Sequence, residues 1–297
     1  MTDTDDHAAD EFAECDVPSD PRSDKPACER VLDHLCANKD NYRVDRELVE
    51  LLDRDVPGLR PAVRSGRVFL ARAVTTALAR TPIERVVSVG LRFPIGFCDH
   101  DQIHRKPPHE VDLHRLVGTI RPEAETLYLD SSPLLLSHAR ALLEGPGVTI
   151  ATADPTAPAP VSAAIEAFAD GSAPLLVCLE LLVLERIPDP RHYLRTVLET
   201  LPPGSYLLFT HLSAAPDTAT TIEKTFVTAG LALRVRTRDE IAELLHGTDP
   251  LPPGLTHPHQ WHPPEDPWAQ DEHDRGWAPA PSDPSLLYAA VTTTKQP

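Results

Sequence analysis

The sequence predicts an α/β fold with a mostly parallel sheet, and three features of the chain carry this prediction. Two apolar runs end on residues suited to ligand contact: 86–90 ends on Gly90, and 127–130 ends on Asp130. A third run, 175–184, is almost continuously apolar, as in a strand buried on both faces. Helical segments separate the runs, and strands that alternate with helices pair in parallel. Because ligands bind beyond the carboxyl ends of such strands, Gly90 and Asp130 mark the predicted site.

Before the first predicted strand, we expect a disordered acidic tail and then a cap of helices. The tail is rich in Asp, Ser and Pro and holds too few apolar side chains to bury a core. Apolar side chains at helical spacing on either side of a polar turn at 38–41 predict two short helices over 30–52. A third helix is expected over about 65–80. The expected organisation is a tail, a helical cap and an α/β domain, over residues 1–26, 27–82 and 83–297.

Turn residues and helix caps place the remaining elements. Ser132-Pro133 suits the start of a helix that Gly145 can end, Asp189-Pro190 opens another, and 237–240 forms a capping box. The other expected strands and helix are 148–152, 205–211, 286–293 and 218–229. A proline-dense segment at about 247–285 predicts an extended loop packed by its aromatic side chains. These are Trp261, Trp268 and Trp277.

Charge and composition restrict the partners of this 297-residue chain. The formal net charge is -17, and a phosphate backbone attracts Lys and Arg but repels carboxylates. No apolar stretch approaches the roughly 18 residues that span a bilayer, and the N-terminus is acidic where a signal peptide is basic. Five scattered cysteines without a CxxC pair predict neither a disulfide framework nor a cysteine-based zinc site. We expect a cytoplasmic protein that acts on small molecules or proteins, with no nucleic-acid or membrane partner.

Short motifs that run collinearly from about Arg30 to the C-terminus give the chain a family resemblance. The N-terminal motifs are 30–35, 39–42 with Asp45-Arg46, and 69–74. The later motifs are the strand tipped by Asp130, 109–111, 138–143, 187–189 and 203–207. In them the chain resembles the actinobacterial S-adenosylmethionine-dependent methyltransferase-like proteins with an N-terminal helical cap. The resemblance implies a Rossmann-like, seven-stranded, mostly parallel sheet with helices on both faces and an antiparallel last strand.

The resemblance also implies that the sheet binds S-adenosylmethionine (SAM), with Asp130 on the ribose and Asp154 near the adenine amino group. The residues themselves agree, because an acid at the tip of the second strand can accept hydrogen bonds from both ribose hydroxyls. The alternative for Asp130 is a charge at a helix N-terminus beside the Ser132 cap. The other expected cofactor contacts are Asn41, Tyr42, Ser88, Gly90 and Ser131.

The chain departs from the family in the loop after the first strand. Such families carry an acid two residues before the first glycine, where this chain has Ser88, and a glycine two residues after it, where this chain has Arg92. Residues 95–108 add length to a short turn, and Ala37-Asn38 replaces paired glycines in the N-terminal motif. These changes fall where the methionine end of the cofactor is expected, so ribose and adenine recognition is the better preserved part.

Candidate catalytic groups lie at the carboxyl ends of the fourth and fifth predicted strands. Methyl transfer from a sulfonium is an in-line displacement, so holding the nucleophile and methyl group collinear in a dry pocket supplies much of the catalysis. Glu185 and His211 can accept a proton from a substrate hydroxyl or amine. Alternatively, Glu185 is solvated or pairs with Arg186, and His211 has backbone partners. Glu180 lies inside an apolar run, so it faces a cavity, has a partner such as an arginine, or the strand ends before it.

The sequence favours SAM-dependent methylation of an unidentified small molecule. One alternative is a non-catalytic relative that binds a nucleoside-type ligand or a protein partner. Another is a metal-dependent hydrolase built on a cluster of ligand-type residues. These are Cys98, Asp99, His100, Asp101, His104, His109 and His114. Their spacing matches no standard site, and 109–114 is not HExxH, so a solvated loop is favoured and no metal is expected. The same holds for His257, His259 and His262.

Overall fold

A seven-stranded sheet with the order β3-β2-β1-β4-β5-β7-β6 forms the centre of the molecule. The computed structural model describes residues 24–95, 110–143, 145–262 and 286–294. β1 to β5 pair in parallel, and β7 is antiparallel to both β5 and β6. The strands are β1 (Arg85–Val89), β2 (Glu125–Asp130), β3 (Val148–Thr152), β4 (Leu175–Leu179), β5 (Tyr206–Leu212), β6 (Asp249–Pro250) and β7 (Leu287–Thr293). The predicted fold class is confirmed.

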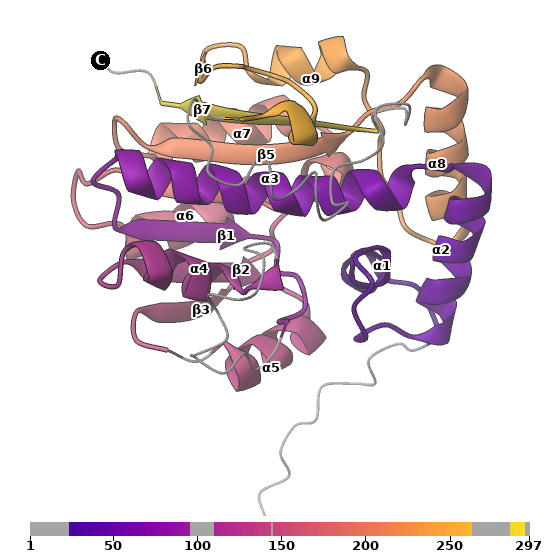
Figure 1. Ribbon diagram of the computed structural model, residues 1–297, viewed down its shortest axis with the longest axis horizontal. Coiled ribbons are helices and arrows are strands. Elements are labelled where there is room, and N and C mark those ends of the chain that lie inside the picture. The colour runs from indigo at the N-terminus through magenta and orange to yellow at the C-terminus, as the bar shows by residue number, and fades with distance from the viewer. Residues whose placement is uncertain (1–23, 96–109, 144, 263–285, 295–297) are drawn as a thin grey trace, which may run out of the picture.

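Helices cover both faces of this sheet and enclose two apolar cores (Figure 1). On one face lie α3 (Leu59–Arg80), α4 (Leu113–Ile120) and α5 (Pro133–Leu142), and on the other lie α6 (Pro158–Phe168), α7 (Pro190–Thr200) and α9 (Arg238–Leu244). Successive strand residues point to opposite faces. Val86 therefore packs in the α3 core, whereas Val87 and Val89 pack in the opposite core. Each is fully buried, which stabilises the fold by about 1.5–3 kcal/mol per side chain.

The cap helices α1 (Cys28–Leu35) and α2 (Arg43–Asp55) pack with α8 (Pro216–Thr228) and the start of α3. Their shared core includes Leu212, the last residue of β5, so the cap lies at the carboxyl ends of the parallel strands. A buried ion pair joins α1 to α2: Arg30 Nε lies 2.7 Å from Asp45 Oδ2. Asp45 also accepts the N–H groups of Ala27 and Tyr42 at 3.0 and 2.8 Å. Removing one partner of such a pair costs about 3–5 kcal/mol, so this contact fixes how the cap is folded.

Several predicted boundaries are wrong. β4 ends at Leu179 instead of continuing to residue 184, because the chain turns through Leu182 (φ +68°) into a 3-10 helix, η3 (Leu184–Arg186). α3 begins at Leu59, directly after Gly58, rather than near residue 65. α4 and α6 were not predicted at all. Apart from these two helices, the apolar runs predicted where the elements lie. The ends of the elements depend on backbone turns, which the apolar pattern does not show.

The proline-dense segment is described as far as residue 262. It contains a second 3-10 helix, η4 (Pro258–Gln260), and buries Trp261 against Phe69, with ring centroids 5.4 Å apart. The predicted packing of this segment by its aromatics holds for Trp261. Most of the acidic tail, most of the insertion at 95–108, and Trp268 and Trp277 lie outside the described residues.

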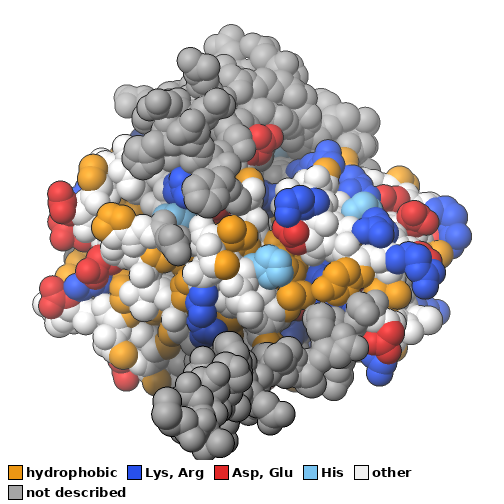
Figure 2. Space-filling model, turned by 90° about the horizontal axis from the view of Figure 1, so that it is seen from below, with side chains coloured by type: hydrophobic (Ala, Val, Ile, Leu, Met, Phe, Trp, Pro, Cys, Tyr) orange, Lys and Arg blue, Asp and Glu red, His pale blue; other side chains and the backbone are white. Residues whose placement is uncertain are grey.

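The described surface gives two further facts about partners. None of the described helices is long and apolar enough to cross a membrane. On the face drawn in Figure 2, acidic and basic side chains are interspersed with apolar ones. That face therefore lacks the uniform positive charge that binding along a phosphate backbone requires.

Candidate functional site

Asp130 ends β2, and its carboxylate holds the loop that follows β1. Oδ2 accepts the N–H of Leu91 at 2.8 Å, and Oδ1 accepts those of Ser131 and Ser132 at 2.8 and 2.7 Å. The side chain is only 6% exposed, and burial raises the pKa of the carboxyl although the three N–H groups act to lower it. An ionised carboxylate offers about four acceptor sites, so one remains, on Oδ2.

Gly90 makes a close approach that only glycine allows. Its φ is +83°, and a Cβ placed on it would lie 2.6 Å from Val183 Cγ2 and 3.6 Å from Glu180 Cβ. Its own N–H donates to the carbonyl of Leu129 at 2.9 Å, which ties the end of β1 to β2. Glycine at this position therefore lets the loop after β1 pack closely against the turn after β4.

A small cleft of about 40 Å³ opens beside this loop, beyond the carboxyl ends of β1, β4 and β5. Its walls come from α1, α3, the loop after β1 and the turn after β4. Four charged side chains line it: Asp33, Arg67, Arg92 and Glu180.

Glu180 lies directly after β4, at the floor of the cleft. Its backbone N–H donates to Val89, and Ser88 Oγ lies 3.4 Å from Oε1, a long hydrogen bond. Burial raises the pKa of this carboxyl, while the charges of Arg92 and Arg67 act to lower it. All three explanations offered for Glu180 apply, since the strand ends before it, it faces a cavity and arginines flank it. The left-handed turn at Leu182 holds it there.

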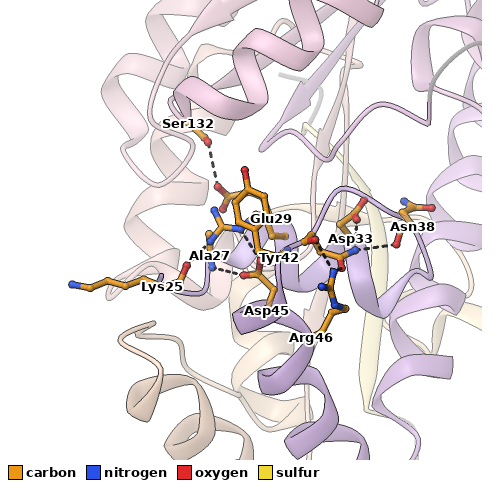
Figure 3. A network of polar contacts seen from close by, with 11 residues as sticks. Lys25, Ala27, Glu29, Asp33, Asn38, Tyr42, Asp45, Arg46 and Ser132 are labelled. Carbon is orange, nitrogen blue, oxygen red and sulfur yellow. Dashed lines mark hydrogen bonds and ion pairs between the residues drawn. The ribbon is translucent and has the colours of Figure 1, made fainter. Parts of the chain in front are cut away.

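Asp33 reaches the cleft from α1. Oδ2 accepts the amide of Asn41 at 2.8 Å, whereas Oδ1 is buried and has no hydrogen-bond partner within the described residues. Burial raises the pKa of this carboxyl. Asn41 also donates to the carbonyl of Asn38 and accepts from Arg46 (Figure 3). Asn41, which was predicted to contact the cofactor, thus bonds to the Asp33 carboxylate and fixes its orientation.

The other predicted cofactor residues are spread along the strand ends. Ser131 is exposed after β2, and Asp154 is exposed after β3, where its Oδ1 accepts from the N–H and hydroxyl of Thr156. Ser88 is buried within β1, and Tyr42 lies under the Arg30 guanidinium, 4.7 Å from its ring centroid, rather than on the cleft. The structure thus brings Gly90, Asp130, Ser131 and Asp154 to one edge, and their binding roles stay predictions.

Glu185 and His211, the predicted catalytic residues, lie together but behind the cleft, with 1% and 0% exposure. Glu185 Oε1 accepts the N–H of Leu212 at 2.7 Å. His211 Nδ1 donates to the carbonyl of Leu212 at 2.8 Å, and Nε2 accepts from Arg236 at 2.8 Å, which assigns a neutral ring. Burial lowers the pKa of His211. Arg236 also donates to two backbone carbonyls near η3, so the cluster ties β5 to the turn after β4.

Within the described ranges, no three His, Cys, Asp or Glu side chains are placed to hold a metal ion. Most of the candidate cluster, residues 98–109, lies outside those ranges. His114 is described: its Nδ1 lies 3.1 Å from the Tyr128 hydroxyl, and burial lowers its pKa to about 4. The ring of His257 packs at a tilt against Tyr288, with ring centroids 4.3 Å apart.

The strand order, the glycine after β1 and the acid that ends β2 define a Rossmann-like methyltransferase fold. The S-adenosyl methyltransferase family model matches residues 17–281, and the chain belongs to this family. The predicted family and cofactor are thereby confirmed: this is a SAM-dependent methyltransferase. No curated protein matches the chain.

Two solved structures share the fold. A DUF574 family protein from Streptomyces avermitilis MA-4680 is 23% identical, with a TM-score of 0.76 over 93% of this chain and 100% of that one. A candidate methyltransferase from Thermobifida fusca YX is 24% identical, with a TM-score of 0.75 over 95% of this chain and 100% of that one. Both likenesses support the assigned architecture.

Sequence reasoning missed two residues of the cleft. Asp33 directly follows the apolar pair Val31-Leu32 in the predicted cap helix, a signal that a buried acid there needs a purpose. Arg67 lies within the apolar stretch of α3 in the same way. The sequence analysis placed Asp33 and Arg67 only within predicted helices. The sequence around each residue does not show that the two helices meet over the sheet.

Proposed function

We propose that this methyltransferase acts on a small molecule that enters the cleft between α1 and α3. The observation that carries the proposal is the position of this cleft, which adjoins the Gly90 and Asp130 edge and lies beyond β1 and β4. SAM supplies a methyl group on a positively charged sulfur. The net charge of -17 disfavours a nucleic acid as the acceptor.

The residues present fit the cofactor. Asp33 lines the cleft, and its Oδ1 is a buried acceptor that lacks a partner among the described residues. The methionyl end of SAM carries an ammonium and a carboxylate. Asp33 would hold the ammonium, while Arg92 and Arg67 would hold the carboxylate. Arg92 stands where the family has a glycine, so a side-chain contact takes the place of a backbone contact.

The adenosine end would lie along the neighbouring strand tips. Asp130 has one acceptor site left for a ribose hydroxyl, and Asp154 has Oδ2 left for the adenine amino group, since Thr156 occupies Oδ1. The fully buried β1 and β2 beneath keep these groups rigid, which limits the reorganisation that binding costs.

We propose Glu180 as the group that accepts the proton of the acceptor, because it is the carboxylate at the end of β4 and faces the cleft. Glu185 and His211 remain the alternative, although Leu212 and Arg236 enclose them. Comparing Glu180→Gln with Glu185→Gln separates the two. If Glu180 accepts the proton, Glu180→Gln lowers kcat and leaves the affinity for S-adenosylhomocysteine (SAH) near wild type. A loss of kcat in Glu185→Gln alone would favour the alternative.

Calorimetry with SAH, followed by labelling with methyl-tritiated SAM, tests the proposal. We expect one bound SAH per chain and label transferred to the low-molecular-weight fraction of an actinobacterial extract. Label that enters only protein would contradict the small-molecule acceptor. SAH binding without any transfer from SAM would favour the non-catalytic alternative.

A further inference from the structure

Asp130 has little acceptor capacity left for both hydroxyls of a ribose. Its two oxygens already accept three backbone N–H groups, from Leu91, Ser131 and Ser132. These bonds hold the loop after β1 and the start of α5, so giving one up would disrupt both. A carboxylate has about four acceptor sites, which leaves one for two ribose O–H donors. The second hydroxyl therefore needs another acceptor near the tip of β2.

Glu29 of α1 is the carboxylate placed to supply it. Glu29 Oε1 accepts the hydroxyl of Ser132 at 3.2 Å (Figure 3), while the N–H of the same serine donates to Asp130. One residue thus bonds to both acids. The negative charge of Glu29 also acts to raise the pKa of Asp130. Among the described contacts of Glu29, Oε1 accepts the Ser132 hydroxyl. Oε2 can therefore accept a hydrogen bond from a ligand.

A second acid on α1 points to a ligand independently. Glu29 and Asp33 are four residues apart, so both lie on the same face of the helix. Asp33 lines the cleft, is 4% exposed, and has one buried oxygen without a described partner. Burying an acceptor without a partner is costly, and a ligand donor in the cleft would remove that cost. The face of α1 that carries both acids is therefore turned toward the cofactor edge.

We propose that Glu29 is the second ribose acceptor, so that α1 belongs to the cofactor site and recognises nucleosides with a complete 2′,3′-diol. This inference rests on the proposed function, in which Asp130 accepts the first hydroxyl. A diol between the two carboxylates donates to both and offsets their repulsion. The Arg30–Asp45 pair, one residue from Glu29, anchors this part of α1 to α2 and keeps Glu29 in place.

Calorimetry with SAH and its 2′-deoxy and 3′-deoxy analogues tests the proposal on the full chain. We expect Glu29→Ala to weaken SAH binding at least about tenfold, the loss of a hydrogen bond to a charged group. Glu29→Gln, which keeps an acceptor oxygen, should lose less. In Glu29→Ala, one of the two deoxy analogues should bind as well as SAH, because the hydroxyl it lacks no longer has its acceptor. Glu50→Ala, an exposed glutamate on α2, is the matched control and should bind as wild type does.

Two outcomes overturn the inference and can be told apart. If wild type binds SAH and Glu29→Ala binds it equally well, with both deoxy penalties intact, Glu29 has no ribose role while the proposed function stands. If wild type does not bind SAH, the proposed function falls and this inference falls with it. Thermal unfolding of each variant, with a midpoint equal to that of Glu50→Ala, shows that a lost affinity is not lost folding.

Discussion

Gly90→Ala should destabilise the protein strongly although it adds a single methyl group. The new Cβ would lie 2.6 Å from Val183 Cγ2, a distance that forces a shift of a buried side chain. The φ of +83° adds left-handed strain for any residue with a Cβ. Overpacking costs about 1–3 kcal/mol and the left-handed conformation about 1–2 kcal/mol, so we expect a loss of about 2–5 kcal/mol in the free energy of unfolding.

Urea unfolding of four chains separates the two contributions: wild type, Gly90→Ala, Val183→Ala and the double variant. Val183→Ala removes the atom that the new Cβ meets. The double variant should therefore be more stable than the sum of the two single effects predicts. The destabilisation that remains in it from Gly90→Ala is the strain of the positive φ. Gly118→Ala is the matched control, because no atom lies within 4 Å of the added Cβ on α4. It should stabilise by about 0.5–1 kcal/mol. A loss below about 0.5 kcal/mol in Gly90→Ala, within the range of neutral surface changes, would refute the close-approach argument.

Three further predictions follow from the site and its surroundings. Ala37→Gly should stabilise the protein by about 1 kcal/mol in urea unfolding, since Ala37 has a φ of +62°, a left-handed conformation that glycine adopts without strain; no gain would contradict strain there. Arg92→Ala should weaken binding of SAH in calorimetry but leave that of adenosine unchanged, and equal losses would refute its role at the methionyl end. Burial holds the pKa of His114 at about 4 and lowers that of His211, both from 6.5, so the unfolded chain binds more protons below pH 6.5. The raised pKa values of Asp33, Asp130 and Glu180 act in the opposite direction but equally in wild type and His114→Gln. As the pH drops from 6.5 toward 4, the free energy of unfolding of wild type should therefore decrease relative to that of His114→Gln, and an equal change in the two chains would contradict this.

The fold could be read from the sequence because its strands are short apolar runs with clear ends. Asp130 and Gly90 stop β2 and β1, and the Thr237–Glu240 capping box opens α9 as predicted. The end of β4 could not be read, because residues 181–184 are as apolar as the strand and only the left-handed turn at Leu182 separates them. Apolar pattern records burial, and burial continues past the strand into the core beneath the cap.

Only part of the candidate site could be predicted from the sequence, because the sequence does not show in which direction a side chain points. A residue after a parallel strand lies at the ligand edge, but its side chain can point into the core, as Glu185 and His211 do. Asp33 and Arg67 reach the cleft from helices that precede the sheet, so their approach depends on tertiary packing. Charged residues within apolar helix faces were the available signal, and they should be weighed as site candidates whenever a cap precedes such a sheet.

The structure of this chain crystallised with SAH tests the central claim most directly. The account predicts adenosine along the tips of β2 and β3, with a ribose hydroxyl on Asp130 and the adenine amino group near Asp154. It also predicts the homocysteine end in the cleft, with its ammonium at Asp33 and its carboxylate at Arg92. SAH bound away from the ends of β1 and β2, or with its homocysteine end outside this cleft, would contradict it.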